Sequence, residues 1–282
     1  MSADRLSPLN DVVFACIFQS EHTSAPAMLD LLNAILKHVG EEQIDEIISI
    51  QSEYPIMGES ANSKYGRLDV RVRSRSGRLF NIEVQVTKDY MNERGFFYGS
   101  RMTRDEFESG TTYDKMPEVR VITIVDYYAR EGSRSIVEPV SLVYENDTKV
   151  RATNKFRMLH IQLPVFRRGH KTLESVQGDR FLEWLYMLDK GYKDEREMEV
   201  LAGMSEGMMN FAQQYNIAIN DPKLKWMYRF EQDALRDKES EISVAVKNNS
   251  VEHARKMKDE GLPIDLIARV TGLPAEDIQK LV

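Results

Sequence analysis

The sequence predicts an α/β fold, in which a mixed β-sheet is flanked by helices and followed by a helical C-terminal part. Residues 66–74 and 79–86 alternate between apolar and polar side chains, which is the two-residue period of a strand. Before them, residues 25–40 place apolar side chains at helical spacing and stop at Gly40. From about Leu173 onward the chain shows no strand-like alternation. Strands enclosed by helical segments indicate helices packed on a sheet.

The other elements follow from the same two periods and from turn residues. A first helix is expected from near Pro8 to the region of Phe18, and a helix over residues 88–110 has Gly110 as its stop. In chain order, the expected elements are helices at 8–18 and 25–40, strands at 45–55, 66–74 and 79–86, a helix at 88–110, strands at 119–128, 138–146 and 156–163, and helices from about 173.

Composition indicates a folded protein with no membrane span and no disulfide framework. The hydrophobic share of 42% and the charged share of 29% are ordinary for a globular chain. No apolar run approaches the roughly 20 residues needed to cross a bilayer, and the first residues do not resemble a secretory signal. Cys16, the only cysteine, lies among apolar residues and is expected to be a buried small hydrophobe. These features favour a reducing compartment, so we expect a cytoplasmic protein.

Positive charge is concentrated in one short segment of an acidic chain. The net charge is −7, yet the segment from Lys64 to Arg104 carries +6 and the rest of the chain −13. A local basic surface can bind phosphates on a protein that is acidic overall. The alternative interpretation is a solvated basic face. The basic residues are Lys64, Arg67, Arg71, Arg73, Arg75, Arg78, Lys88, Arg94, Arg101 and Arg104.

Two carboxylates stand out in the predicted central strands. Glu83 and Gln85 are two residues apart and therefore share one face of their strand. If Arg73 pairs with Leu79 across a five-residue loop, paired residue numbers sum to 152 and Asp69 lies opposite Glu83. Two facing carboxylates repel each other unless a divalent cation such as Mg²⁺ binds them. The alternative is that neighbouring arginines screen the pair on a solvated face.

Several segments, in order along nearly the whole chain, resemble the Rpn family of recombination-promoting nucleases and transposases. This family belongs to the PD-(D/E)XK nuclease superfamily, and the D-x(13)-E-x-Q spacing from Asp69 to Gln85 is similar to its motif. The matching segments are SPLNDVVFACIF at 7–18, GRLDVRV at 66–72, GRLFNIEVQV at 77–86, ERGFFYGSRM at 93–102, ESGTTYDKMPEVRVITIVD at 108–126, and EGLPIDLIARVTGLPAEDIQKL at 260–281.

The resemblance implies a restriction-endonuclease-like core at residues 1–170 and a helical C-terminal region at 171–282. It implies that Asp69 and Glu83 hold Mg²⁺ or Mn²⁺ and that Gln85 takes the place where lysine is commonest. Asp11 is implied as a further ligand or water-positioning residue, with a helix N-cap as the alternative.

Two further residues are candidates for the expected site. Lys88 could supply the positive charge that Gln85 lacks, or it could be an ordinary exposed residue. Tyr98 could face the site, or it could belong to the core. The chain departs from the family at Ala15, where lysine is frequent, and at 162–165, where an acid and a lysine are frequent. The expected DNA contacts are Arg67, Arg71, Arg73, Lys88 and Arg101.

The resulting hypothesis is a metal-dependent DNA endonuclease of low sequence specificity, linked to recombination or mobile elements. The alternative is a catalytically inactive protein of the same fold that binds nucleic acid or a partner. The five histidines lack the spacing of a zinc site, and nucleotide-binding glycine motifs are absent from the sequence.

The C-terminal tail is predicted to be two short helices, each opened by a proline. They superficially resemble a helix-turn-helix, but Glu276 and Asp277 against Lys280 make a poor charge pattern for a DNA groove. Together with a long helix at about 239–260, they are expected to serve packing or homo-oligomer formation.

Overall fold

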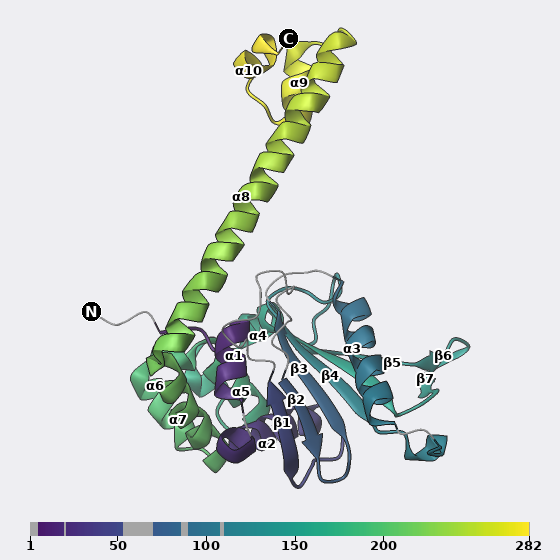
Figure 1. The fold of residues 1–282 in the computed structure, drawn as a ribbon, viewed down its shortest axis with the longest axis vertical. Helices are drawn as coiled ribbons and strands as arrows, with labels where there is room; N and C mark the ends of the chain where they lie inside the picture. The colour runs from purple at the N-terminus through teal and green to yellow at the C-terminus, as the bar shows by residue number, and fades with distance from the viewer. Residues whose placement is uncertain (1–4, 20, 53–69, 86–89, 108–109, 282) are drawn as a thin grey trace. The chain divides into compact units, whose positions relative to one another are not determined.

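The computed structural model describes residues 5–19, 21–52, 70–85, 90–107 and 110–281, and for Gln85 the backbone only. The chain divides into two compact units, Met1–Lys225 and Trp226–Val282, and each is described by itself (Figure 1). Among the described residues, no helix combines the length and the apolar character that crossing a membrane requires.

A mixed six-stranded sheet forms the centre of the first unit, as the sequence predicts. Its strand order is β1-β2-β3-β4-β8-β5. The first three strands are antiparallel neighbours, β3, β4 and β8 run parallel, and β5 pairs antiparallel with β8. The bounds are β1 Ile47–Ser52, β2 Val70–Ser74, β3 Leu79–Gln85, β4 Val119–Val125, β5 Val137–Ser141 and β8 Phe156–Gln162.

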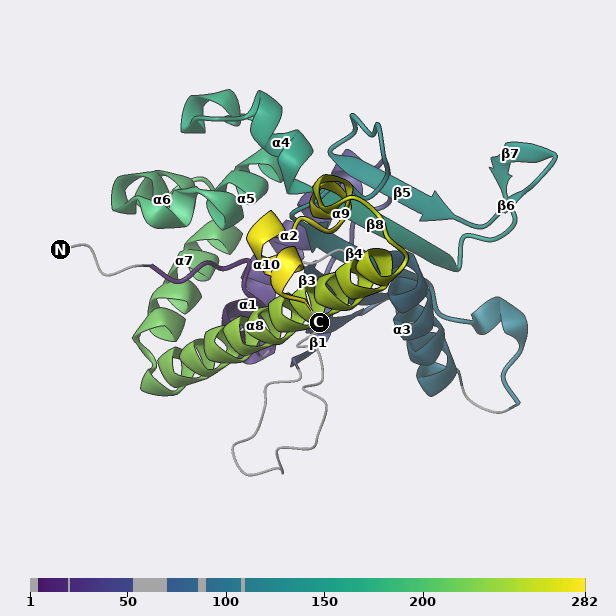
Figure 2. The same cartoon turned by 90° about the horizontal axis from the view of Figure 1, so that it is seen from above.

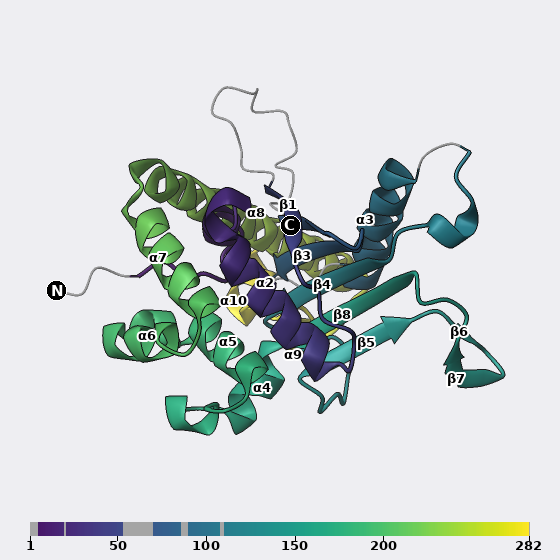
Figure 3. The same ribbon diagram turned by 90° about the horizontal axis from the view of Figure 1, so that it is seen from below.

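Helices cover both faces of this sheet. The helix α3 (Met91–Glu106) connects the parallel strands β3 and β4 and packs on them and on β8. Figures 1 and 3 show α3 on one side of the sheet and α1, α2 and α5–α7 on the other. The helices of that second layer are α1 Asp11–Ile17, α2 Glu21–His38, α5 Arg180–Asp189, α6 Glu195–Ala202 and α7 Glu206–Asn220, with α4 at Leu163–Gly169.

Two glycines let α3 approach the sheet closely. A Cβ at Gly95 would lie 2.8 Å from the Sδ of Met158, and one at Gly99 would lie 2.3 Å from the Cε2 of Phe156. Neither is a normal contact distance, so the backbone of α3 rests directly on β4 and β8. Figure 2 shows α3 lying against these strands. The close packing fixes which α3 side chains can reach the sheet beside it.

The helices α4 to α7, which follow β8, belong to the same compact unit as the sheet. The α7 helix packs against α1 and α2. Asn210 bonds the backbone of α2, with its Nδ2 donating to the Thr23 carbonyl at 2.9 Å and its Oδ1 accepting from the Ala27 amide at 3.3 Å. The Tyr215 hydroxyl donates to the carbonyl of Leu6 at 2.8 Å. The N-terminal helices are therefore buried by residues some 190 positions later in the chain.

The second unit is helical, and its two proline-opened C-terminal helices are those the sequence predicts. The long helix α8 (Pro222–Asp259) begins well before the expected position near residue 239. A small core of Ala254, Ile267 and Ile278 holds its end against α9 (Ile264–Thr271) and α10 (Ala275–Lys280). Gly272 adopts a φ of 72° between these helices, a conformation that favours glycine.

Three elements differ from the expected pattern. The α2 helix begins at Glu21 rather than at residue 25. The strand expected over 138–146 is divided into β5 and β6 (Val143–Tyr144), and β6 pairs with β7 (Asp147–Arg151) in a separate two-stranded sheet. The sequence does not indicate β7, because its residues are polar and all five are exposed, so burial imposes no alternation.

Candidate active site

A row of polar side chains crosses the α3 face of the sheet. Glu83 of β3 pairs with Thr123 of β4, Thr123 with His160 of β8, and His160 with Glu138 of β5. Paired residues on neighbouring strands point to the same face and lie about 5 Å apart. Glu83, Thr123 and His160 are all buried. Burial of this many polar groups in one row calls for specific partners.

Arg94 of α3 is a partner of Glu83. Its guanidinium forms an ion pair with the Glu83 carboxylate, and the two side chains are 15% and 7% exposed. The neighbouring Gly95 lies against the sheet, so the helix backbone holds Arg94 over β3. The Coulomb attraction within a charge pair that is shielded from water is stronger than within the same pair on the surface. Glu83 is therefore a carboxylate held in place, and not a solvated surface acid.

Asn92 and Asn81 extend the polar cluster. The Nε2 of His160 lies 3.1 Å from the Oδ1 of Asn92. Burial lowers the pKa of His160 to about 4, so its ring is neutral at pH 7 and Nε2 donates this hydrogen bond. Within the described part of the chain, the His160 Nδ1 and both side-chain polar atoms of Asn81 are buried without a hydrogen-bond partner. Such atoms mark a place where a ligand or water can be bound.

The β2–β3 register agrees with the sequence prediction. Arg73 pairs with Leu79, and Val70 pairs with Ile82, so paired residue numbers sum to 152. The five residues between Arg73 and Leu79 form the connecting turn, in which Gly77 has a φ of 82°. Asp69 lies outside the described residues. Its expected position opposite Glu83 stays a prediction, now with the register on which it depends confirmed.

The other expected site residues are placed as follows. Gln85 is in β3, two residues after Glu83, and only its backbone is described. Asp11 is the first residue of α1, which packs on β3; the N-cap is Asn10, whose side chain accepts from the amides of Val12 and Val13. The N-cap alternative for Asp11 is therefore wrong. Arg67 and Lys88 lie outside the described residues.

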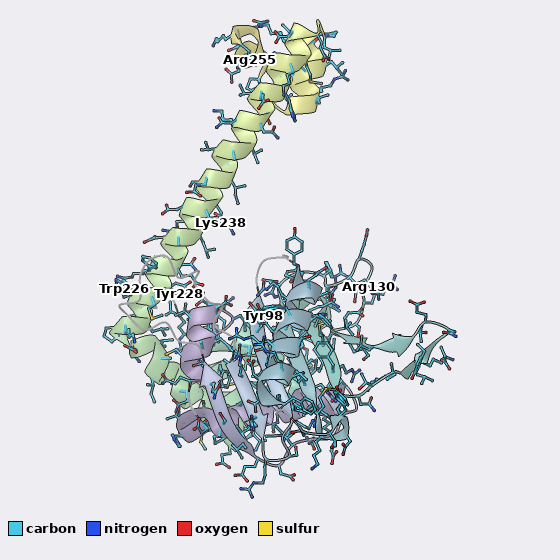
Figure 4. The ribbon with its side chains drawn as sticks, turned by 45° about the vertical axis from the view of Figure 1, so that its right-hand side comes forward. Tyr98, Arg130, Trp226, Tyr228, Lys238 and Arg255 are labelled. Atoms are coloured by element: carbon cyan, nitrogen blue, oxygen red, sulfur yellow. The ribbon has the colours of Figure 1, made fainter. Side chains whose placement is uncertain are left out.

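Tyr98 is half-buried on α3 and is labelled in Figure 4. It lies four residues after Arg94, so the two side chains share one face of the helix. Its ring centroid lies 5.7 Å from that of Phe97.

Ion pairs offset much of the positive charge of the basic segment. Arg73 pairs with Glu106, and Arg101 with Asp105 at 3.5 Å. Arg71, on the same sheet face, is half-buried. Acids from outside the segment therefore neutralise part of its +6 charge. An arginine in an exposed, weak pair such as Arg101–Asp105 can readily leave its carboxylate to bind a phosphate. Other ion pairs among the described residues of this segment are Arg75–Glu46, Arg78–Glu41, Arg78–Glu118 and Arg104–Asp105.

A cleft of about 840 Å³ lies away from Glu83, at the other end of β3 and β4. It is bordered by the 75–78 turn and by residues 115–118, and two of its guanidiniums, those of Arg78 and Arg120, pair with Glu41. Because these cations are already engaged by an acid of the protein, the polar row is the better candidate site.

Sequence reasoning missed most of the polar row. Asn81 was visible on the face of Glu83, but Thr123 and His160 join it only through parallel pairing of strands far apart in the sequence.

Of the two departures from the family, Ala15 is fully buried in α1, where a lysine would lose its hydration. Gln162 is buried and bonds the loop before β5 at Ala129, Ser133 and Ser135.

The donor atoms around Glu83 suit a hard divalent cation. Hard cations bind oxygen ligands, and Glu83 and Asn81, two residues apart in β3, present a carboxylate and an amide oxygen on the same strand face. Within the described ranges no group of three His, Cys, Asp or Glu residues is close enough to hold a metal. Asp69, the second expected carboxylate, lies outside those ranges.

Comparison with known proteins gives one result. The model of the PD-(D/E)XK nuclease family transposases matches residues 8–245, which include both carboxylates and the polar row. No curated protein and no solved structure matches the chain. The matched region covers most of the 282 residues and contains the mixed sheet with its flanking helices. The chain therefore belongs to the PD-(D/E)XK nuclease family transposases.

Proposed function

We propose that this protein is a divalent-metal-dependent DNA endonuclease of low sequence specificity, acting in recombination or the movement of mobile elements. The observation that carries the proposal is the β2–β3 register, in which paired residue numbers sum to 152. One further pair in the same register would join Asp69 to Glu83. The family supports hydrolysis of nucleic acid and the link to mobile elements.

Asp69 and Glu83 would hold Mg²⁺ or Mn²⁺, with Asn81 beside them on the same strand face. When bound, the ion polarises the scissile phosphate and lowers the pKa of a water molecule that attacks it in line. Gln85 can orient this water through its amide, which both donates and accepts hydrogen bonds. Asp11, on a helix that packs against β3, is a candidate for accepting the proton of the water.

Binding of DNA would rest on cations at the edge of the site. Arg101 is half-exposed and weakly paired, so it can turn to a backbone phosphate at low cost. Arg67, Arg71, Arg73 and Lys88 are the other proposed contacts. Contacts to phosphates position the duplex without reading its sequence, in agreement with low specificity.

Plasmid nicking tests the proposal. Purified protein is incubated with supercoiled plasmid in Mg²⁺, in Mn²⁺ and in EDTA, beside Asp69→Asn and Glu83→Gln. We expect nicking in either metal, none in EDTA, and loss of at least about a hundredfold in both variants. Wild-type nicking by either variant, in protein shown to be folded by circular dichroism, would remove these residues from the mechanism.

The same assay addresses the alternative of an inactive binding protein. A wild-type chain that binds DNA in a filter or anisotropy assay but nicks it under neither metal would favour that alternative. The absence of a lysine at Gln85 is the feature that motivates it.

A further inference from the structure

We propose that Arg94 is the cation that serves this site in place of the lysine absent at Gln85. In the metal-free protein it holds the Glu83 carboxylate. When metal and DNA bind, it releases this carboxylate and its guanidinium contacts the scissile phosphate. The inference rests on the proposed function and assigns a further substrate-contacting residue to the same site.

The first support is position. The guanidinium of Arg94 forms an ion pair with Glu83, and it reaches the carboxylate from α3 rather than from β3. Gly95 and Gly99 bring the helix onto β4 and β8, so the packing of α3 on the sheet places Arg94 within reach of Glu83. With a cation supplied from α3, the site does not need a lysine at position 85, two residues after Glu83.

The second support is chemistry. A guanidinium matches two oxygens of a carboxylate or of a phosphate through two parallel hydrogen bonds. A divalent cation and Arg94 both bind Glu83, so they compete for it. A guanidinium displaced from Glu83 by the metal remains within a side chain's length of the position where the phosphate must lie. It can there stabilise the extra negative charge of the transition state.

The third support is burial. The Arg94 side chain is 15% exposed and the Glu83 side chain 7%. A surface arginine would exchange partners with water and contribute little. A shielded arginine has few other partners within reach. When the Arg94 guanidinium leaves Glu83, we therefore expect its new anionic partner to be a phosphate of the substrate.

The experiment compares Arg94→Gln, Arg94→Lys and the control Arg236→Gln in two measurements. Arg236 lies on α8, outside the basic segment and the polar row; it is 74% exposed and pairs with Asp233. Mn²⁺ binding is titrated calorimetrically without DNA, and plasmid nicking is measured under saturating Mn²⁺. Circular dichroism checks that each variant is folded.

For Arg94→Gln we expect Mn²⁺ to bind about tenfold more tightly, because a competing cation is gone. We expect nicking to fall by about a hundredfold or more, because the phosphate has lost its cation. Arg94→Lys should recover part of the nicking, since it restores charge without the two-pronged geometry. Arg236→Gln should match the wild type in both measurements.

A purely structural arginine would give other results. Nicking by Arg94→Gln at the wild-type rate, or Mn²⁺ affinity that is unchanged or weaker, overturns the proposal. If Arg94→Gln does not fold, Arg94→Lys decides: wild-type Mn²⁺ affinity together with wild-type nicking contradicts a role that depends on the guanidinium fork.

Failure of the proposed function gives a separate signature. If the wild type nicks no DNA, yet Arg94→Gln binds Mn²⁺ more tightly, competition for Glu83 is supported while the endonuclease assignment fails. If the wild type binds no Mn²⁺, both fail together.

Discussion

The Nε2 of His160 on β8 lies 3.1 Å from the Oδ1 of Asn92 on α3, which joins the sheet to the helix that carries Arg94. In this hydrogen bond Nε2 bears a proton and donates it to the amide oxygen of Asn92. Burial lowers the pKa of His160 to about 4, and the nearby carboxylate of Glu138 only partly opposes this shift. The neutral imidazole is thus part of the packing between α3 and the sheet.

We predict that His160 makes the fold sensitive to mild acid. Its pKa is depressed on folding, so the unfolded chain takes up the proton first. Its contribution to stability is complete above about pH 6.5 and is lost as the pH falls toward 4. The loss should reach about 3 kcal/mol. Urea unfolding of the wild type and of His160→Gln between these pH values measures it.

The control for this prediction is His253→Gln, at an exposed position of α8. It should follow the wild-type pH dependence, whereas His160→Gln should show a shallower one. Equal slopes for all three proteins would show that His160 does not titrate in this range.

A second prediction concerns Glu41, which follows α2 and receives three guanidiniums. Arg120 contacts it at 2.7 Å, Arg157 at 2.6 Å and Arg78 at 3.0 Å. Burial alone would raise the pKa of Glu41, but the hydrogen bonds from Arg157 and Arg120 outweigh it and hold this pKa below 4.5. Replacing the carboxylate leaves buried cations without their partner, so Glu41→Gln should cost about 3–5 kcal/mol of unfolding free energy.

The neighbouring exposed residue provides the comparison. Glu42→Gln removes one charge at the next position and should change the unfolding free energy by less than about 0.5 kcal/mol. Since the pKa of Glu41 is depressed, its contribution is present above pH 4.5 and disappears as the pH falls below that value. Similar stabilities of the two variants at pH 7 would contradict the importance of this cluster.

A third prediction tests the contact between α3 and the sheet. In Gly99→Ala the new Cβ would lie 2.3 Å from the Cε2 of Phe156, so the helix or the ring must move. Overpacking of this kind costs about 1–3 kcal/mol, against about 1 kcal/mol gained from the helix preference of alanine. Chemical denaturation should find Gly99→Ala less stable than Ser100→Ala, an exposed position on the same helix. A Gly99→Ala protein as stable as that control would show that α3 is free to shift.

A fourth prediction isolates the electrostatic part of DNA binding. Arg101→Gln should weaken binding to unrelated duplexes alike and reduce the slope of log K against log salt by about one, because one phosphate contact is lost. Fluorescence anisotropy in EDTA measures binding without cleavage. The matched control is Arg236→Gln on α8, where an exposed arginine pairs with Asp233 at 3.1 Å. An unchanged slope for Arg101→Gln would remove this residue from the contact surface.

A fifth prediction concerns Asp69 without metal. If Asp69 faces Glu83, Asp69→Ala relieves repulsion between two carboxylates, and apo thermal stability should be unchanged or slightly higher. A structural aspartate would instead lose about 1–3 kcal/mol on truncation. A lower melting temperature in EDTA would count against the facing pair, whatever the nicking result.

The sequence is sufficient for the parts of the fold that depend on local spacing. The β2–β3 register follows from a short loop and strict alternation, so Arg73 opposite Leu79 was predictable. The parallel pairing of β3, β4 and β8 was not predictable. Thr123 and His160 lie on strands that are buried on both faces, so no alternation of apolar and polar residues indicates their register. Arg94 was visible only as one more basic residue. Its place over Glu83 depends on the rotation of α3, which Gly95 and Gly99 set through contacts with distant strands.

The packing of α7 on α1 and α2 has a consequence for synthesis on the ribosome. The apolar face of α2 emerges early, but Asn210 and Tyr215, which help to cover the N-terminal helices, are made about 180 residues later. At bacterial or eukaryotic elongation rates this interval lasts roughly ten to forty seconds. During that time the nascent chain exposes the apolar face of α2, which α7 covers only after it has been synthesised. We therefore expect truncation before α7 to yield an aggregated chain rather than a smaller folded protein.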